Sequence, residues 1–171
     1  MIYLDKEKTK PADIKQDEYG YYVLTGDNTY YVFGDAKVIA MDKVKVYLKE
    51  NSRAHAFDYS KVIAFDNSEV MAFGNSKVGA YDNSEVGAYD NSKVRSYDNS
   101  KVSAYSNSSV ESYGNSEVIA FDNSKVSAYS NSSVESYGNS EVMAFGNSKV
   151  SAYDNSKVRS YNNAKLIDKR G

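Results

Sequence analysis

Valine recurs every eight residues along most of this chain of 171 residues, and that interval restricts the fold more than any other feature of the sequence. A small residue, usually serine, lies two positions before each valine, and alanine or serine lies two positions after it, as in Ser60, Val62 and Ala64. Alternation with a period of two is typical of a β-strand that buries one face. We therefore expect the Ser-x-Val-x-Ala positions to point inward and the positions between them to face solvent. The residues in the valine register are Val38, Val46, Ala54, Val62, Val70, Val78, Val86, Val94, Val102, Val110, Val118, Val126, Val134, Val142, Val150, Val158 and Leu166.

The residues around these inward positions agree with that interpretation. The position before valine is mostly Lys or Glu, and the position after it varies, for example from Ile63 to Arg95. An aromatic residue follows, then Asp, Gly or Ser, then Asn. Pairs such as Asp66-Asn67 favour a tight corner, because these residues tolerate left-handed backbone conformations. Each octad thus predicts one strand of five residues and one corner, and 17 such strands fit between residues 36 and 168.

Repeats of a fixed period predict an all-β fold, a parallel β-solenoid in which each coil lies about 4.8 Å above the last. The chain has a single proline, Pro11, and the proline-free tract after it suits uninterrupted backbone hydrogen-bond ladders. Identical residues of successive coils then lie over one another. We expect the asparagines at the corners to form a ladder of stacked amides.

The number of octads in one coil has two solutions. Two octads make a flat, two-sided coil of about 16 residues, and three make a triangular coil of about 24 residues. The segments 103–126 and 127–150 are near-duplicates three octads apart, which favours the triangle. A core of only Ser, Val and Ala favours the flat coil, because it fills a thin gap between two sheets and would leave a hole in a triangle. We predict the flat coil of about 16 residues and keep the triangular coil of about 24 residues as the alternative.

The two ends of the repeat region differ. Residues 19–33 read as a β-hairpin around the sequence TGDN, and we expect residues 1–33 to be an N-terminal arm with a hairpin that caps the solenoid of residues 34–171. The C-terminal sequence AKLIDKRG offers no comparable cap. Leu166 and Ile167 followed by charged residues are one way to end the solenoid, and end-to-end pairing of two copies through the last coil, as a homodimer, is the other.

Candidate catalytic and metal-binding groups are sparse. The chain has no cysteine and one histidine, His55, so zinc sites and Cys/His catalysis lack ligands. Aspartates at the corners could suggest calcium, but Gly74 takes the position that Asp66 holds, which fits turn chemistry better. Glu111 and Glu135 read as repeat copies on a solvated face. We expect no enzyme activity, no catalytic residue, no metal and no cofactor.

The aromatic position of the octad is the strongest candidate for a binding surface. Phe occurs where the residue two positions earlier is His, Ile or Met, and Tyr occurs where it is Gly, Ser, Arg or Glu, as expected for neighbours on one exposed face. Stacked rings that shield the backbone ladder are one explanation. The other is a ridge that binds a protein or a sugar. The candidate binding ridge is Phe65, Phe73, Tyr81, Tyr89, Tyr97, Tyr105, Tyr113, Phe121, Tyr129, Tyr137, Phe145 and Tyr153.

The motif AYDNSKV and its variants resemble those of tandem octapeptide-repeat β-solenoid proteins, which are often found in bacterial prophage and mobile-element regions. The resemblance covers residues 34–168. It implies the solenoid fold and says little about activity, since such proteins mostly lack an assigned one.

Taken together, these patterns favour a non-enzymatic scaffold or protein-binding module with an extended Tyr/Phe- and charge-patterned surface, and a mobile-element origin would suit an inhibitor of a host protein. An ice-binding protein is one alternative, although Thr9, Thr25 and Thr29 all lie outside the repeats. A phage or fibre structural component is another. The net charge of −2 argues against nucleic acid as a partner. The N-terminal sequence has no apolar leader and no stretch is long enough to span a membrane, so we expect a cytoplasmic protein without a membrane partner.

Overall fold

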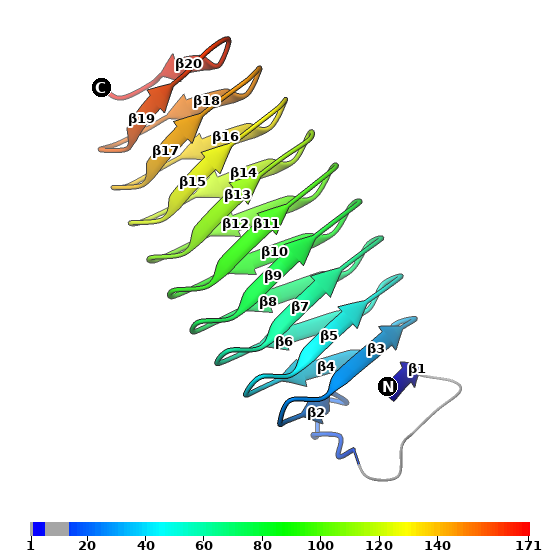
Figure 1. The fold of residues 1–171 in the computed structure, drawn as a ribbon. Coiled ribbons are helices and arrows are strands. Elements are labelled where there is room, and N and C mark those ends of the chain that lie inside the picture. Colours follow the sequence, from blue (N-terminus) through cyan, green and yellow to red (C-terminus); the bar gives the residue numbers. More distant parts are fainter. Residues whose placement is uncertain (1, 6–13) are drawn as a thin grey trace.

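The computed structural model describes residues 2–5 and 14–171, and β-strands joined by tight corners make up this part of the chain (Figure 1). The strands form two parallel sheets of ten strands each. Sheet A holds the strands with odd numbers: β1 (Ile2–Asp5), β3 (Thr29–Phe33), β5 (Lys45–Leu48), β7 (Lys61–Ala64), β9 (Lys77–Ala80), β11 (Lys93–Ser96), β13 (Ser109–Ser112), β15 (Lys125–Ala128), β17 (Glu141–Ala144) and β19 (Lys157–Ser160). Sheet B holds the strands with even numbers: β2 (Tyr22–Leu24), β4 (Lys37–Ala40), β6 (Arg53–Ala56), β8 (Glu69–Ala72), β10 (Glu85–Ala88), β12 (Lys101–Ala104), β14 (Glu117–Ala120), β16 (Ser133–Ser136), β18 (Lys149–Ala152) and β20 (Lys165–Asp168).

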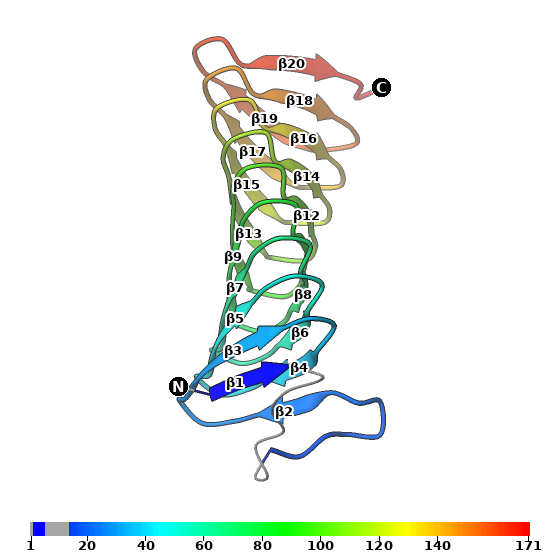
Figure 2. The same ribbon diagram turned by 90° about the vertical axis from the view of Figure 1, so that its right-hand side faces the viewer.

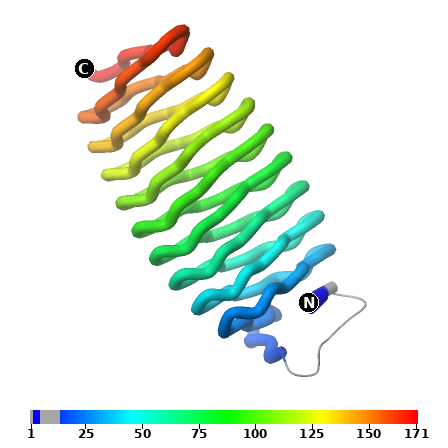
Figure 3. The backbone as a smooth tube through the Cα atoms, in the orientation of Figure 1, coloured from blue at the N-terminus to red at the C-terminus, as the bar shows by residue number. Residues whose placement is uncertain are grey.

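The chain changes sheet at every corner, so two strands and two corners complete one coil. From β2 onward each strand pairs with the strand two places further along, in a register of two octads, as in Val62 with Val78 and Val86 with Val102. The odd and even strands face each other as two layers (Figure 2), and the coils stack evenly along the molecule (Figure 3). The flat solenoid with about 16 residues per coil is therefore confirmed, and the triangular alternative is excluded. The 17 strands expected between residues 36 and 168 are β4 to β20.

The core between the sheets consists of the three inward rows of the octad. Every valine from Val62 to Val150 in this register is at most 4% exposed, and the serine and alanine rows beside it are buried as well. The predicted facing of the strands is thus confirmed. Larger side chains, such as Leu24 and Leu48, fill the core near the N-terminal end. The small Ser, Val and Ala side chains elsewhere suit a thin core between two sheets.

Each corner is held by bonds within one coil and between successive coils. The serine that follows a corner donates its backbone N–H to the carbonyl of the aromatic residue, as Ser60 does to Phe57 at 3.1 Å. The residue after the aromatic has a positive φ, 57° at Asp58 and 65° at Gly74, a conformation that Asp, Asn and Gly tolerate best. The carboxylate of Asp58 also accepts the N–H of Asp42, one coil earlier, at 3.2 Å. Aspartate is therefore favoured at the corner for two reasons, and glycine can replace it.

The asparagines at the corners bond mainly through their backbone. The N–H of Asn75 donates to the carbonyl of Asp58 at 2.9 Å, and the same bond recurs at most corners. Among the described residues, the only amide-to-amide bond between these side chains joins Asn147 to Asn131, at 3.5 Å. The expected asparagine ladder is thus replaced by backbone and aspartate bonds.

The N-terminal hairpin predicted over residues 19–33 is wrong. β2 lies in sheet B and β3 in sheet A, and each pairs in parallel with a repeat strand. The TGDN segment is an ordinary corner, and Gly26 within it has a φ of 86°. Tyr22 and Tyr30 take the position that valine holds in later coils, so the two strands continue the solenoid.

Two other segments extend the N-terminal end. β1 pairs with β3 and adds a further strand to sheet A. Residues 15–21 cross the end of sheet B, where the N–H of Val23 donates to the carbonyl of Lys15 at 2.9 Å and Gln16 forms an antiparallel bridge with Tyr22. Part of the predicted arm, residues 6–13, lies outside the described residues.

Candidate binding surfaces

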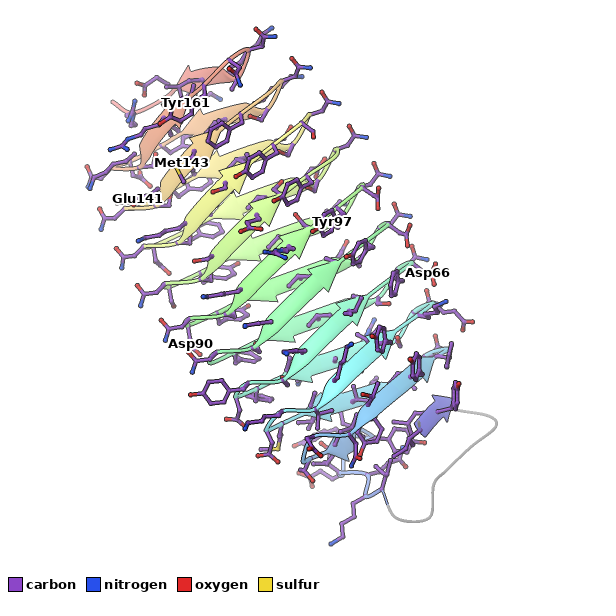
Figure 4. The ribbon with its side chains drawn as sticks, in the orientation of Figure 1. Asp66, Asp90, Tyr97, Glu141, Met143 and Tyr161 are labelled. Carbon is purple, nitrogen blue, oxygen red and sulfur yellow. The ribbon has the colours of Figure 1, made fainter. Side chains whose placement is uncertain are left out.

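The structure divides the predicted aromatic ridge between the two edges of the solenoid. Rings that follow sheet A strands form one stack, which we call ring ladder A: Phe65, Tyr81, Tyr97, Tyr113, Tyr129, Phe145 and Tyr161. Rings that follow sheet B strands form ring ladder B: Phe57, Phe73, Tyr89, Tyr105, Phe121, Tyr137 and Tyr153. Figure 4 shows the corners after the two sheets, marked by Asp66 and Asp90, on opposite edges. The twelve candidates therefore form two half-exposed surfaces and not one.

Within each ladder the rings stack face to face. Neighbouring centroids lie 4.5 Å apart at Tyr137 and Tyr153 and 5.3 Å apart at Phe121 and Tyr137, the two extremes of the series. Such offset stacking stabilises neighbouring strands beyond the area that it buries. Because each ring covers the faces of its neighbours, only ring edges remain for an external partner.

Lysines cover one end of each ladder. Lys49 takes the aromatic position one coil before Phe65, and its Nζ lies 5.9 Å from the centroid of that ring. Lys169 takes the position one coil after Tyr153, with its Nζ 5.4 Å from that centroid. A cation over a ring face is attracted by the π-system, so each lysine covers a ring face that would otherwise be left without a stacked neighbour.

The choice between Phe and Tyr at the aromatic position depends on the residue two positions earlier, and the structure shows why. The hydroxyl of Tyr137 donates a hydrogen bond to Glu135, two residues earlier, at 3.0 Å, and this bond raises the pKa of Tyr137 to about 12. At Gly87 the ring of Tyr89 lies so close that an added Cβ would be 3.1 Å from it. Phenylalanine has no hydroxyl to satisfy, so it suits apolar neighbours such as Met71. The expectation that these two positions contact each other is confirmed.

A row of lysines runs along the outer face of sheet A at the opposite end of the strands from ring ladder A. We call it the lysine row: Lys45, Lys61, Lys77 and Lys93 lie in register in β5, β7, β9 and β11. None of the four forms an ion pair with another described residue. Glu141, which Figure 4 labels, later takes the same position in β17. It pairs with Lys157 at 3.8 Å.

The same outward position in sheet B carries both signs of charge. Arg53, Glu69, Glu85 and Lys101 follow one another in β6, β8, β10 and β12. Arg53 and Glu69 form an ion pair at 3.0 Å. From residue 61 to residue 93 the octads alternate Lys and Glu and look balanced, but a coil of two octads places these three lysines in sheet A and the two glutamates, Glu69 and Glu85, in sheet B. Comparison of residues that are one octad apart does not reveal this separation. Comparison of residues that are two octads apart, which is one whole coil, would have revealed it.

Sheet B carries a shallow groove of about 470 Å³ on its outer face. Gly87 and Ser103 form its floor, and the bulkier Met71 and Ile119 lie toward its two ends. His55 lies near its N-terminal end, with its ring 4.9 Å from that of Tyr21, and burial lowers the pKa of His55. Charged residues such as Glu85 and Lys101 and aromatic residues such as Tyr89 and Tyr105 complete its lining.

The candidate chemical groups from the sequence do not assemble into a site. Glu111 is in β13 of sheet A and Glu135 is in β16 of sheet B, so the two carboxylates lie on opposite faces. Within residues 2–5 and 14–171, no group of three His, Cys, Asp or Glu side chains could hold a metal ion. The repeat serines are buried, and several donate to backbone carbonyls, as Ser100 does to Tyr97 at 2.8 Å.

Comparisons with protein-family models, with curated proteins and with solved structures found no match. No helix in the described part of the chain has the length and apolar character that crossing a membrane requires.

Proposed function

We propose that this protein is a non-enzymatic β-solenoid scaffold that binds another protein through its outward-facing side chains. The observation that carries the proposal is the contrast between the inner and outer rows. The three inward rows hardly change from coil to coil: the first is Ser, the second is Val, and the third is Ala or Ser. Outside, the middle position of successive sheet A strands changes from Ile63 to Gly79 to Arg95 to Glu111. Different side chains on a constant frame suit recognition of a surface more than chemistry at one point.

The frame itself supports this role. Both sheets are hydrogen-bonded along their length, and adjacent rings and corners add contacts between coils. A rigid surface loses little conformational freedom on binding, which favours affinity. An inhibitor that covers a site on another protein is the more specific form of this function that we propose, and the cytoplasm is the compartment that we propose for it.

Affinity capture from a lysate of the source cell tests the proposal, provided that capture is combined with site-specific photo-crosslinking. A crosslinker replaces Ser127 on sheet A or Ser103 on sheet B, since both serines point outward. We expect one protein in stoichiometric amount to crosslink to one face and not to the other. Turnover of a substrate by the purified protein, abolished by a surface substitution, would contradict the non-enzymatic part of the proposal.

A second proposal is an end-to-end homodimer through β19 and β20, each of which pairs on one side only. Leu166 and Ile167 of β20 are 38% and 48% exposed, whereas Val150, one coil before Leu166, is fully buried. A second copy could cover these side chains and extend both sheets. Sedimentation of the purified chain should show a dimer that Leu166→Lys dissociates. A monomer at high protein concentration counts against it.

A further inference from the structure

The lysine row is an arrangement that the fold does not need. Like charges directly opposite each other on neighbouring strands repel, and the row places four in succession on sheet A. The pair of Arg53 and Glu69 shows that the same octad position accepts opposite charges in sheet B. Three of the four lysines, Lys61, Lys77 and Lys93, are exposed.

Among the described residues, the carboxylates at the corners that lead into these strands form no ion pair with the row. The corner residues Asp58 and Asp90 precede Lys61 and Lys93 by three positions. The carboxylate of Asp58 accepts the N–H of Asp42 at 3.2 Å, and that of Asp90 accepts the N–H of Gly74 at 3.1 Å. Both carboxylates are engaged at the edge of the solenoid and neither forms an ion pair with the row, so an acidic partner can add an attraction that the fold does not supply.

An apolar row lies beside the lysines. It occupies the middle position of the sheet A strands, runs through Tyr31, Tyr47, Ile63 and Gly79, and ends at Arg95 of β11. Tyr31 and Tyr47 stack with their centroids 4.8 Å apart, and both are half-buried. The partner that fits these two rows is therefore acidic along one line and apolar along the next.

The spacing of the lysine row selects the shape of that partner. Successive lysines are one coil apart, about 4.8 Å, so four of them span about 14 Å. An α-helix offers one side chain per turn along a given line, about 5.4 Å apart, so four span about 16 Å. Side chains on one face of an extended peptide are about 6.8 Å apart, so four span about 20 Å. The span of the lysine row is closer to that of the helix than to that of the extended peptide, and the flexible lysine side chains can absorb this smaller difference in spacing.

The width of the surface agrees with a helix as well. The two rows are two residues apart along each strand, about 6.6 Å, and an α-helix with its side chains is about 10 Å across. One helix parallel to the long axis of the solenoid thus covers both rows. Single-stranded nucleic acid fits less well, because ring ladder B, at the corners that lead into these strands, offers its edges and no free ring faces on which bases could stack.

We propose that sheet A, from β5 to β11, binds an amphipathic α-helix of a partner protein. One acidic side chain per helical turn lies against the lysine row, and an apolar stripe packs on Tyr47 and Ile63. This inference rests on the proposed function, protein binding, and it names the face and the kind of partner.

A designed helical peptide tests the inference directly. A fluorescent peptide of about 18 residues carries one glutamate per turn beside a leucine stripe, and fluorescence anisotropy follows its titration with the whole chain. We expect binding that weakens about tenfold or more in the variant Lys61→Ala/Lys77→Ala/Lys93→Ala. The matched variant Lys101→Ala/Lys149→Ala/Lys165→Ala makes the same change in net charge on sheet B, and we expect it to weaken binding less than twofold. All six lysines are exposed, and urea unfolding of both variants verifies that they fold.

Several outcomes would overturn the inference. These are absence of peptide binding, equal weakening by the two triple variants, and equal binding of a peptide with its glutamates scattered around the helix. Tighter binding of an oligothymidylate than of the peptide would also overturn it, in favour of nucleic acid. If the peptide fails to bind and a captured partner crosslinks to sheet B, the helix site on sheet A is wrong but the proposed function, protein binding, stands. Capture with no partner on either face counts against the proposed function itself.

Discussion

The carboxylate of Asp90 accepts a hydrogen bond from the backbone N–H of Gly74, one coil earlier, at 3.1 Å, while Asp90 itself has a φ of 58°. The residue thus links two coils and tolerates a left-handed conformation. Asp90→Ala should lower the free energy of unfolding by about 1–2 kcal/mol, because it removes the bond and strains the backbone. Asp90→Gly removes only the bond and should have about half that effect. Urea unfolding measures both, and equal losses would show that the backbone conformation contributes nothing.

The facing of the strands predicts opposite outcomes for two charged substitutions. Val110 is 2% exposed and lies in the core, so Val110→Asp should unfold several coils, since burial of an unpaired carboxylate costs several kcal/mol. Lys125 is exposed on the outer face, and Lys125→Glu should change the free energy of unfolding by less than about 0.5 kcal/mol. Circular dichroism during thermal unfolding compares the two, and equal tolerance would contradict the assignment.

Much of this fold could be predicted from the sequence, because each octad contains both the alternating pattern of one strand and the turn residues of one corner. The choice between two and three octads per coil depended on core volume, and a core of Ser, Val and Ala decided it correctly. The hairpin was predicted wrongly because Tyr22 and Tyr30 hold the valine position, and the alternation of tyrosine, valine and leucine there suits a hairpin equally well. These two buried rings lie in the first coils of the solenoid, where Leu24 and Leu48 also replace the small core side chains of later coils.

The surfaces were harder to predict than the core. Side chains that are one octad apart, such as Lys61 and Glu69, look like neighbours in the sequence but lie on opposite sheets. Both the lysine row and the division of the aromatic ridge follow from a coil of two octads. A surface pattern can therefore be read only after the number of octads per coil is known.

Ring ladder A should contribute to stability through Tyr97, which stacks between Tyr81 at 4.7 Å and Tyr113 at 5.1 Å. Tyr97→Ala removes both contacts and should lower the free energy of unfolding by about 1–3 kcal/mol. Tyr97→Phe keeps the ring and should remain within about 0.5 kcal/mol of the original chain. Chemical denaturation distinguishes the two variants, and a similar loss in both would show that the hydroxyl matters more than the stack.

The pKa of Tyr137 gives stability a specific dependence on alkaline pH. Its hydrogen bond to Glu135 raises the pKa of Tyr137 to about 12, from 10.0 in an unfolded chain. The unfolded state therefore loses its proton first, and this contribution to stability is complete below pH 10.0 and is lost as the pH rises toward about 12. Tyr137→Phe should unfold less steeply with pH in that window than the original chain. Glu135→Gln should lower the pKa of Tyr137, as ultraviolet titration of tyrosinate would show, and an unchanged titration would contradict the role of Glu135.

One substitution made on both sheets should have opposite effects on stability. Lys77 lies between Lys61 and Lys93, so Lys77→Glu replaces two repulsive neighbours by two attractive ones and should raise the free energy of unfolding by about 0.5 kcal/mol. Lys101 lies between Glu85 and Glu117, so Lys101→Glu should lower it by a similar amount.

Urea unfolding at low ionic strength measures both changes, and added salt should reduce them, because the charges are exposed. The gain expected from Lys77→Glu matters most for the interpretation. If Lys77→Glu does stabilise the chain, a single substitution gives a more stable arrangement of charges than the lysine row. The row is then kept at the expense of stability, as is common for binding surfaces. If Lys77→Glu destabilises the chain, the row is already neutralised within the fold, and the charge argument for an acidic partner fails.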